Sequence, residues 1–216
     1  MIYLVALLEK GNTELLELAI LGLLKEKPMH GYELKKRLSF LLGHFWTVSY
    51  GSLYPALKRL EKGGAIERAY SVKEKTRNRN VFRITRRGEA EFIRMLGDAD
   101  ASNSLSDPEK FDIRMAFFQY LQPEVRLDLL RKRRELVEEQ LAKFKAYKSS
   151  NSNQDHYQSG LLRHKVEQTR SDIRWLDRLI EHEEKTIRER DEQEKDEEQK
   201  LPEHAETRHV KAASSA

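Results

Sequence analysis

Seven lysine and arginine residues occur within the fifteen positions from Lys73 to Arg87, and Glu74 is the only acidic residue among them. Side chains of this kind form ion pairs with the phosphates of a nucleic acid and release its condensed counterions. The alternative for any basic segment is a solvated loop of ordinary surface. The seven residues are Lys73, Lys75, Arg77, Arg79, Arg83, Arg86 and Arg87.

The segments on both sides of this basic stretch have the periodicity of short helices and strands. Three helices are predicted at Thr13–Leu24, His30–Leu42 and a segment that starts at Ser49 or Ser52 and ends at Lys62. After Gly63–Gly64 the period changes, and Ile66–Val72 and Val81–Ile84 predict two strands joined by a polar tip at Lys73–Asn80. Thr85 then predicts the N-cap of a helix that runs to Leu96.

This order of elements, with a basic hairpin between the third and fourth helices, is typical of a winged helix-turn-helix. The third helix of such a domain enters the major groove with its N-terminal residues, and a basic hairpin contacts flanking phosphates. Tyr32 fits two positions equally well: one in which its hydroxyl donates to a phosphate, and one in the half-buried core. The predicted DNA-binding residues are Tyr32, Ser49, Tyr50, Gly51, Ser52, Tyr54, Lys58, Arg59, Lys73, Lys75, Arg77 and Arg79.

The second half of the chain has the pattern of a helical dimerisation domain. Apolar residues recur every seven positions from Val166 to Ile187, and Thr169 and Glu183 at intervening positions indicate a weak coiled coil. A stripe of β-branched residues needs a partner, so we expect it to pack on the helix after Pro123 and on a second copy of the chain. The predicted dimerisation residues are Leu130, Val137, Phe144, Val166, Ile173, Leu176 and Ile180.

The predicted fold class is therefore mostly α with a small β-hairpin. We expect an N-terminal extension at 1–12, a winged helix-turn-helix at 13–96 and a small, polar linker at 97–108. A helical dimerisation domain at 109–187 and a charged, disordered tail at 188–216 follow.

Charge is divided unevenly between the two halves. Residues 1–96 contain 18 Lys and Arg against 10 Asp and Glu, whereas the remainder contains 22 against 26. A basic module joined to a part with another role accounts for this division. The chain has no cysteine, and its apolar runs are shorter than the ~20 residues of a membrane span. We expect a cytoplasmic protein without a membrane partner.

No catalytic or metal-binding pattern is present in the sequence. The seven histidines are scattered, and several lie in polar stretches. Gly63–Gly64 ends a helix and lacks the surroundings of a phosphate-binding loop. We therefore predict that the chain is not an enzyme and has no cofactor. The alternative to a DNA-binding regulator is a winged-helix and coiled-coil adaptor that binds protein or RNA without specific DNA binding.

Four segments resemble the winged-helix core of PadR-type transcriptional regulators. They are His30–Leu34 (HGYEL), Phe45–Ser49 (FWTVS), Gly51–Ile66 (GSLYPALKRLEKGGAI) and Phe82–Gly88 (FRITRRG). The second half, with Trp175–Asp177 in its last helix, is similar to the helical domain of the family's virulence-activator branch. Thr76–Asn80 departs from the Gly-Arg-Pro-like wing turn that is common in the family. The resemblance implies a cytoplasmic dimeric repressor, or less often an activator, on a roughly palindromic operator.

An aromatic cluster in the second half suggests a site for a small molecule, because regulators of this family often respond to aromatic or drug-like compounds. The alternative is that the rings are core and dimer interface. The candidate effector pocket consists of Phe111, Phe117, Phe118, Tyr120 and Trp175.

Overall fold

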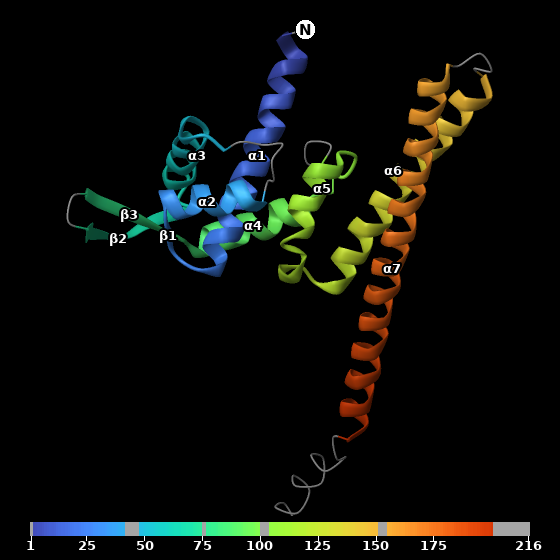
Figure 1. Ribbon diagram of the computed structural model, residues 1–216. Coiled ribbons are helices and arrows are strands. Elements are labelled where there is room, and N and C mark those ends of the chain that lie inside the picture. Colours follow the sequence, from blue (N-terminus) through green and yellow to red (C-terminus); the bar gives the residue numbers. More distant parts are fainter. Residues whose placement is uncertain (1, 42–47, 75–76, 100–103, 151–154, 201–216) are drawn as a thin grey trace, which may run out of the picture.

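The computed structural model describes residues 2–41, 48–74, 77–99, 104–150 and 155–200. A winged-helix body carries a small sheet on one side, and the two longest helices form an arm on the other (Figure 1). The predicted fold class, mostly α with a β-hairpin and a winged helix at the N-terminus, is confirmed. In the described part of the chain, no helix combines the length and apolarity that a bilayer crossing requires.

The first helix, α1, spans Ile2–Glu26 and forms the centre of the body. The predicted start at Thr13 is wrong, because the apolar run before it continues the same helix. Ala19, Ile20 and Leu21 are completely buried, and α1 contacts α2, α3, α4, α5 and β3. Burial on most of its circumference explains why its sequence is apolar beyond a single stripe.

Helices α2, Gly31–Leu41, and α3, Tyr50–Lys62, pack against α1 and each other. Leu34 and Leu38 of α2 are buried, and so are Leu53 and Leu57 of α3, which confirms the predicted i, i+4 stripes. Each helix therefore has one apolar side in the body and leaves the other for solvent.

The sheet has the strand order β1-β3-β2 and is antiparallel throughout. Its strands are β1, Met29–His30, β2, Ile66–Glu74, and β3, Arg77–Ile84. Pairing continues to Glu74 opposite Arg77, so the hairpin strands reach farther than predicted. The sequence did not predict β1, which pairs with β3 at Met29 and Phe82.

Helix α4, Arg86–Gly97, begins where the sheet ends. Thr85 is its N-cap, as predicted: its Oγ1 accepts from the Gly88 amide at 3.1 Å and donates to the Gly64 carbonyl at 2.7 Å. A Cβ on Gly88 would lie 1.9 Å from the Ala65 carbonyl oxygen. Only glycine allows helix and strand to approach this closely.

Two buried arginines hold the segment between the body and the arm. Arg114, on α5 (Pro108–Met115), donates its Nη2 to three carbonyl oxygens, at 2.9, 2.6 and 2.6 Å, of Met95, Leu96 and Asp98. Its side chain is 1% exposed, and this burial lowers the pKa of its guanidinium. Arg133 donates to the carbonyls of Leu105 and Ser106 at 2.5 and 2.9 Å. The carbonyls that end α4 are thus satisfied by a side chain.

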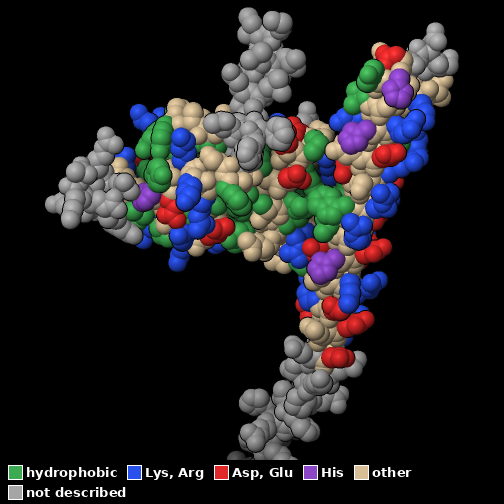
Figure 2. Space-filling view, viewed as in Figure 1, with side chains coloured by type: hydrophobic (Ala, Val, Ile, Leu, Met, Phe, Trp, Pro, Cys, Tyr) green, Lys and Arg blue, Asp and Glu red, His purple; other side chains and the backbone are tan. Residues whose placement is uncertain are grey.

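Helices α6, Pro123–Ser150, and α7, His156–Lys200, pair along the length of α6 as the arm, and α7 extends beyond the start of α6 (Figure 1). A short 3₁₀ helix, η2 (Phe118–Tyr120), precedes α6, so the helix predicted to run through Phe118 ends earlier, at Met115. Helix α7 continues thirteen residues past 187, where we expected the tail to begin. Acidic and basic side chains cover its far end (Figure 2).

Candidate nucleic-acid interface

The start of α3 is held by a pair of serines. Ser49 is its N-cap, and its Oγ accepts from the Ser52 amide at 3.1 Å. The Ser52 hydroxyl donates to the Ser49 carbonyl at 3.0 Å. Of the two predicted starts, the structure has Ser49. Both predicted contact residues are exposed, but their hydroxyls already stabilise the helix end.

The exposed face of α3 carries a line of predicted contact residues. Tyr50 and Tyr54 are 42% and 54% exposed, and Lys58 lies one turn farther along. Gly51 is exposed beside them. Arg59 is exposed but is paired, with its Nε 2.7 Å from Glu17 Oε1. The structure therefore brings the α3 residues to one surface while Arg59 binds α1.

Helix α2 adds a further side chain to the same end of the body. Tyr32 is 61% exposed, so its side chain is not a half-buried core residue. The helix start is closed by His30, whose Nδ1 accepts from the Glu33 amide at 3.0 Å. A hydrogen bond from the Lys27 ammonium lowers the pKa of the Glu33 carboxyl, which stays ionised near neutral pH.

An ordered group of side chains joins α2 to α3. The Tyr50 and Tyr54 rings stack with centroids 5.9 Å apart and an interplanar angle of 26°. Lys35 Nζ lies 4.1 Å from the centroid of the Tyr50 ring. Lys35 was not among the predicted residues, because this contact is made between helices. The signal for it in the sequence is the i, i+4 spacing that Gly31 and Lys35 share with the two tyrosines.

The hairpin formed by β2 and β3 projects from the body beside α3 (Figure 1). Two arginines nearer the body form ion pairs within the protein. Arg83 Nε lies 2.5 Å from Glu67 Oε1, and Arg68 Nε lies 2.8 Å from Glu61 Oε1. The structure gives the backbone register of most of the predicted tip. The four predicted tip residues have side chains that lie outside the described part of the chain; they are Lys73, Lys75, Arg77 and Arg79.

The predicted aromatic residues pack on one another edge to face. Phe111 contacts Phe118 and Trp175 with centroids 6.0 and 6.5 Å apart. Phe92 of α4 packs edge to face on Phe117 and on Tyr120, with ring centroids 5.8 and 5.5 Å apart. The structure therefore brings the five predicted residues to the junction of body and arm as packed rings.

A cavity of about 310 Å³ lies between α1, α4 and α5. Apolar side chains and the buried Arg114 contribute to its lining, together with acidic and basic groups. The Nε atom of Arg114 is buried and has no hydrogen-bond partner among the described residues. The lining residues include Leu15, Leu18, Met95 and Arg114.

The predicted dimerisation residues fall into two groups on the arm. Leu130 and Val137 of α6 and Leu176 of α7 are buried between the two helices. Phe144 and the predicted stripe of α7 are only half-buried; that stripe consists of Val166, Ile173, Ile180 and Ile187. The deeper residues of α7 are the intervening ones, which are Leu162, Thr169, Leu176 and Glu183.

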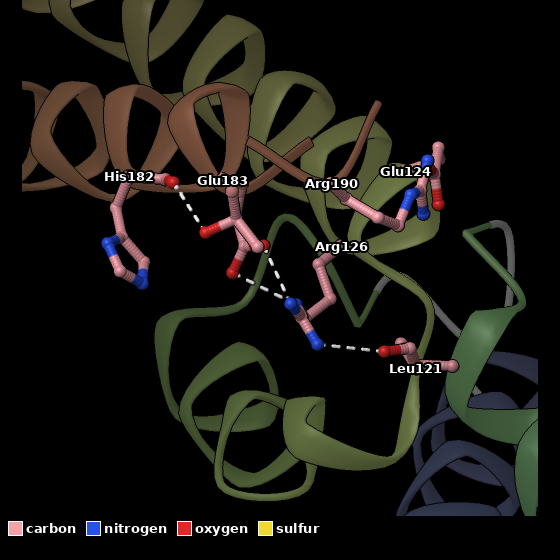
Figure 3. Close-up of polar contacts among 7 residues, drawn as sticks. Leu121, Glu124, Arg126, His182, Glu183 and Arg190 are labelled. Atoms are coloured by element: carbon pink, nitrogen blue, oxygen red, sulfur yellow. Dashed lines mark hydrogen bonds and ion pairs between the residues drawn. The ribbon is translucent and has the colours of Figure 1, made fainter. Parts of the chain in front are cut away.

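Ion pairs connect the two helices of the arm. Arg126 binds Glu183 and also donates to the Leu121 carbonyl at 2.8 Å, and Arg190 lies beside Glu124 (Figure 3). No group of three or more His, Asp or Glu side chains suited to a metal ion is found in the part of the chain that the structure describes.

Helix packing, sheet order and capping together define a winged-helix protein with a helical second domain. Residues 20–94 match the family described as "Transcriptional regulator PadR-like family", and residues 109–183 match "Virulence activator alpha C-term". The chain therefore has a PadR-like domain at its N-terminus, followed by a domain of the virulence-activator C-terminal type.

One similar protein comes from Bacillus subtilis. The chain is 30% identical over 77 residues to the negative transcriptional regulator PadR, a match that covers 36% of this chain and 42% of that relative. Crystal structures of Bacillus subtilis PadR with operator DNA and with p-coumaric acid are each 21% identical to the chain. The first has a TM-score of 0.38 and covers 78% of this chain and 98% of that one. The second has a TM-score of 0.35 and covers 79% of this chain and 99% of that one.

Proposed function

We propose that the chain is a transcriptional repressor that binds a palindromic operator as a homodimer in the cytoplasm. The observation that carries the proposal is the capped, exposed start of α3, which presents Ser49, Tyr50 and Tyr54 next to a hairpin with a basic tip. A helix start of this kind suits the major groove, and a basic hairpin suits the adjoining backbone.

In this proposal residues 13–96 of each copy occupy one half-site, and residues 109–187 hold the two copies together. Residues 97–108 connect them. The half-buried apolar stripe of α7 supports pairing, because a second copy would cover the apolar surface that α6 leaves open. Two-fold symmetry of the dimer then requires two-fold symmetry of the operator.

Selection from a pool of random-sequence duplexes tests DNA binding. We expect enrichment of a palindrome whose half-site centres are about 34 Å apart or a multiple of that spacing, with affinity that falls as salt rises. Absence of an enriched sequence overturns the proposal. Retention of RNA or of protein partners by the same preparation would then identify the chain as an adaptor.

Light scattering of the full chain tests the dimer. We expect a dimer at micromolar concentration, with or without DNA. A monomer at that concentration overturns both the dimer and the palindromic operator.

We also propose that a small aromatic molecule releases the repressor from DNA. The cavity between α1, α4 and α5 has a volume within the usual range for such ligands, and it shares α5 with Phe111 of the aromatic cluster. Titration of a Trp46→Phe variant, in which Trp175 is the single tryptophan, with phenolic and amphipathic compounds tests this. A change in Trp175 emission together with release of operator DNA is expected, and an unchanged signal throughout leaves the rings as core.

A further inference from the structure

Two residues of α2 lie opposite two residues of α3 with the same spacing. Gly31 and Lys35 are four residues apart on α2, and Tyr50 and Tyr54 are four apart on α3. Lys35 lies over the Tyr50 ring. A Cβ on Gly31 would be 3.4 Å from Tyr54 Oη and 3.7 Å from its ring. The stacked tyrosines therefore lie between a lysine at one end and a glycine at the other.

This arrangement restricts the motion of two exposed rings. The ammonium of Lys35 is attracted by the face of Tyr50, and Tyr50 in turn stacks on Tyr54. Both rings remain 42% or more exposed, so the array is at the surface and does not serve as core. An ordered ring loses less conformational entropy on contact with a ligand than a mobile one.

The serines beside these rings cap the helix, and we therefore look to the rings for recognition. The hydroxyls of Ser49 and Ser52 bond to the backbone of the first turn, so Tyr50 and Tyr54 provide the exposed rings at the start of α3 that are not used in capping. In the major groove an apolar side chain distinguishes thymine by its C5-methyl group. Ring edges at the start of α3 fit that contact.

We propose that Lys35 is a positioning residue for operator recognition, holding the Tyr50–Tyr54 pair against thymine methyl groups of the half-site. The inference rests on the proposed DNA-binding function. Its ligand is duplex DNA with thymine under the start of α3, and Lys35 acts through the ring and not through a phosphate.

Uracil-substituted DNA tests this, because uracil lacks only the methyl group. The probes are the duplex selected by the wild-type chain, the same duplex with uracil for thymine, and a scrambled duplex. Wild type should lose about fourfold in affinity for each thymine methyl contact that uracil removes, and therefore about fifteenfold when one contact is lost in each of the two half-sites. Lys35→Met should bind the thymine duplex about fivefold more weakly and should lose most of its preference for thymine over uracil.

Lys35→Arg is the conservative variant, and it should restore affinity and thymine preference because it keeps a cation over the ring. Lys36→Met is the matched control, since Lys36 is the exposed neighbour on α2 and the charge change is the same. Combination of Lys35→Met with Tyr50→Leu should cost no more than Tyr50→Leu alone.

Three outcomes overturn the inference while the proposed function stands. They are a wild type that does not distinguish uracil from thymine, a Lys35→Met variant that keeps the wild-type preference, and additive effects in the double variant. A lysine that only binds phosphate would weaken specific and scrambled duplexes alike and lower the salt slope by about 0.9. Failure of wild type to select any duplex overturns the proposed function, and the inference with it.

Discussion

Arg126 and Glu183 form a two-point ion pair across the arm, with Nε 2.9 Å from Oε1 and Nη2 2.8 Å from Oε2. Their side chains are 18% and 12% exposed. Glu183 occupies a position of α7 where a coiled coil usually has an apolar residue. The pair therefore compensates a charge inside the seam and fixes the register of α6 on α7.

Arg126→Met should lower the free energy of unfolding by about 3 kcal/mol, because it leaves the Glu183 carboxylate buried without its partner. The double variant Arg126→Met with Glu183→Leu should recover most of this loss, since both buried charges are gone. Urea unfolding followed by circular dichroism measures both. Arg131→Ala is the control: its pair with Glu184 is 55% and 38% exposed and should contribute at most about 0.5 kcal/mol.

Replacement of Lys75, Arg77 and Arg79 by alanine should weaken binding to all duplexes alike. Each residue that binds a phosphate adds about 0.9 to the slope of log affinity against log salt, so the triple variant should have a shallower slope. Fluorescence anisotropy at several salt concentrations measures it. The same charge change at Lys143, Lys145 and Lys148, exposed on α6, should leave the slope unchanged. Wild-type affinity in the hairpin variant would show that this hairpin does not contact DNA.

Ser49→Asp should preserve the fold and reduce DNA binding. Aspartate is as good an N-cap as serine, but its charge would face phosphates, so we expect roughly tenfold weaker binding at low salt. Ser49→Ala should cost about 1 kcal/mol of stability. Thr85→Ala is matched to it, because Thr85 caps α4 in the same way away from the proposed DNA surface. Equal DNA affinity of Ser49→Asp and wild type would contradict placement of this helix start in a groove.

Gly88→Ala should destabilise the winged helix by about 3 kcal/mol or more, since its Cβ would meet the Ala65 carbonyl at 1.9 Å and backbone would have to move. Gly160→Ala has the opposite expectation. Gly160 lies in α7, and apart from the adjacent residues and the backbone of its own helix, no heavy atom of the described residues lies within 4 Å of the point that an alanine methyl would occupy. Alanine should therefore stabilise by about 0.5–1 kcal/mol. Thermal unfolding compares the two, and a Gly88→Ala variant as stable as wild type would contradict the close approach.

Local signals in the sequence predicted most of the body. The leucine stripe of α3, the cap at Thr85 and the change of period after Gly64 each depend on residues close in the chain. The strand β1 was missed because two residues carry no periodicity and its pairing with β3 is made across more than fifty positions. The α1 start was misplaced at Thr13 because a capping residue inside a helix looks like one at its end.

Contacts between elements were the part that the sequence could not predict. The lysine over the Tyr50 ring and the use of Arg114 to bind the carbonyls at the end of α4 depend on how helices cross. The heptad of α7 was found, but burial is deepest at Leu176 and its equivalents and not at the β-branched stripe. The ion pair with Arg126 explains how the Glu183 carboxylate is accommodated between the two helices.

The central helix α1 gives the molecule a mechanical property. It contacts α3, the helix proposed to read DNA, and α5, the first helix of the second domain. Phe117 lies against Gly22 so closely that a Cβ there would be 2.5 Å from the ring, which leaves no slack between them. In the proposed dimer, a small rotation at the junction would therefore move α1 as a rigid body, and the two α3 helices would change their separation together.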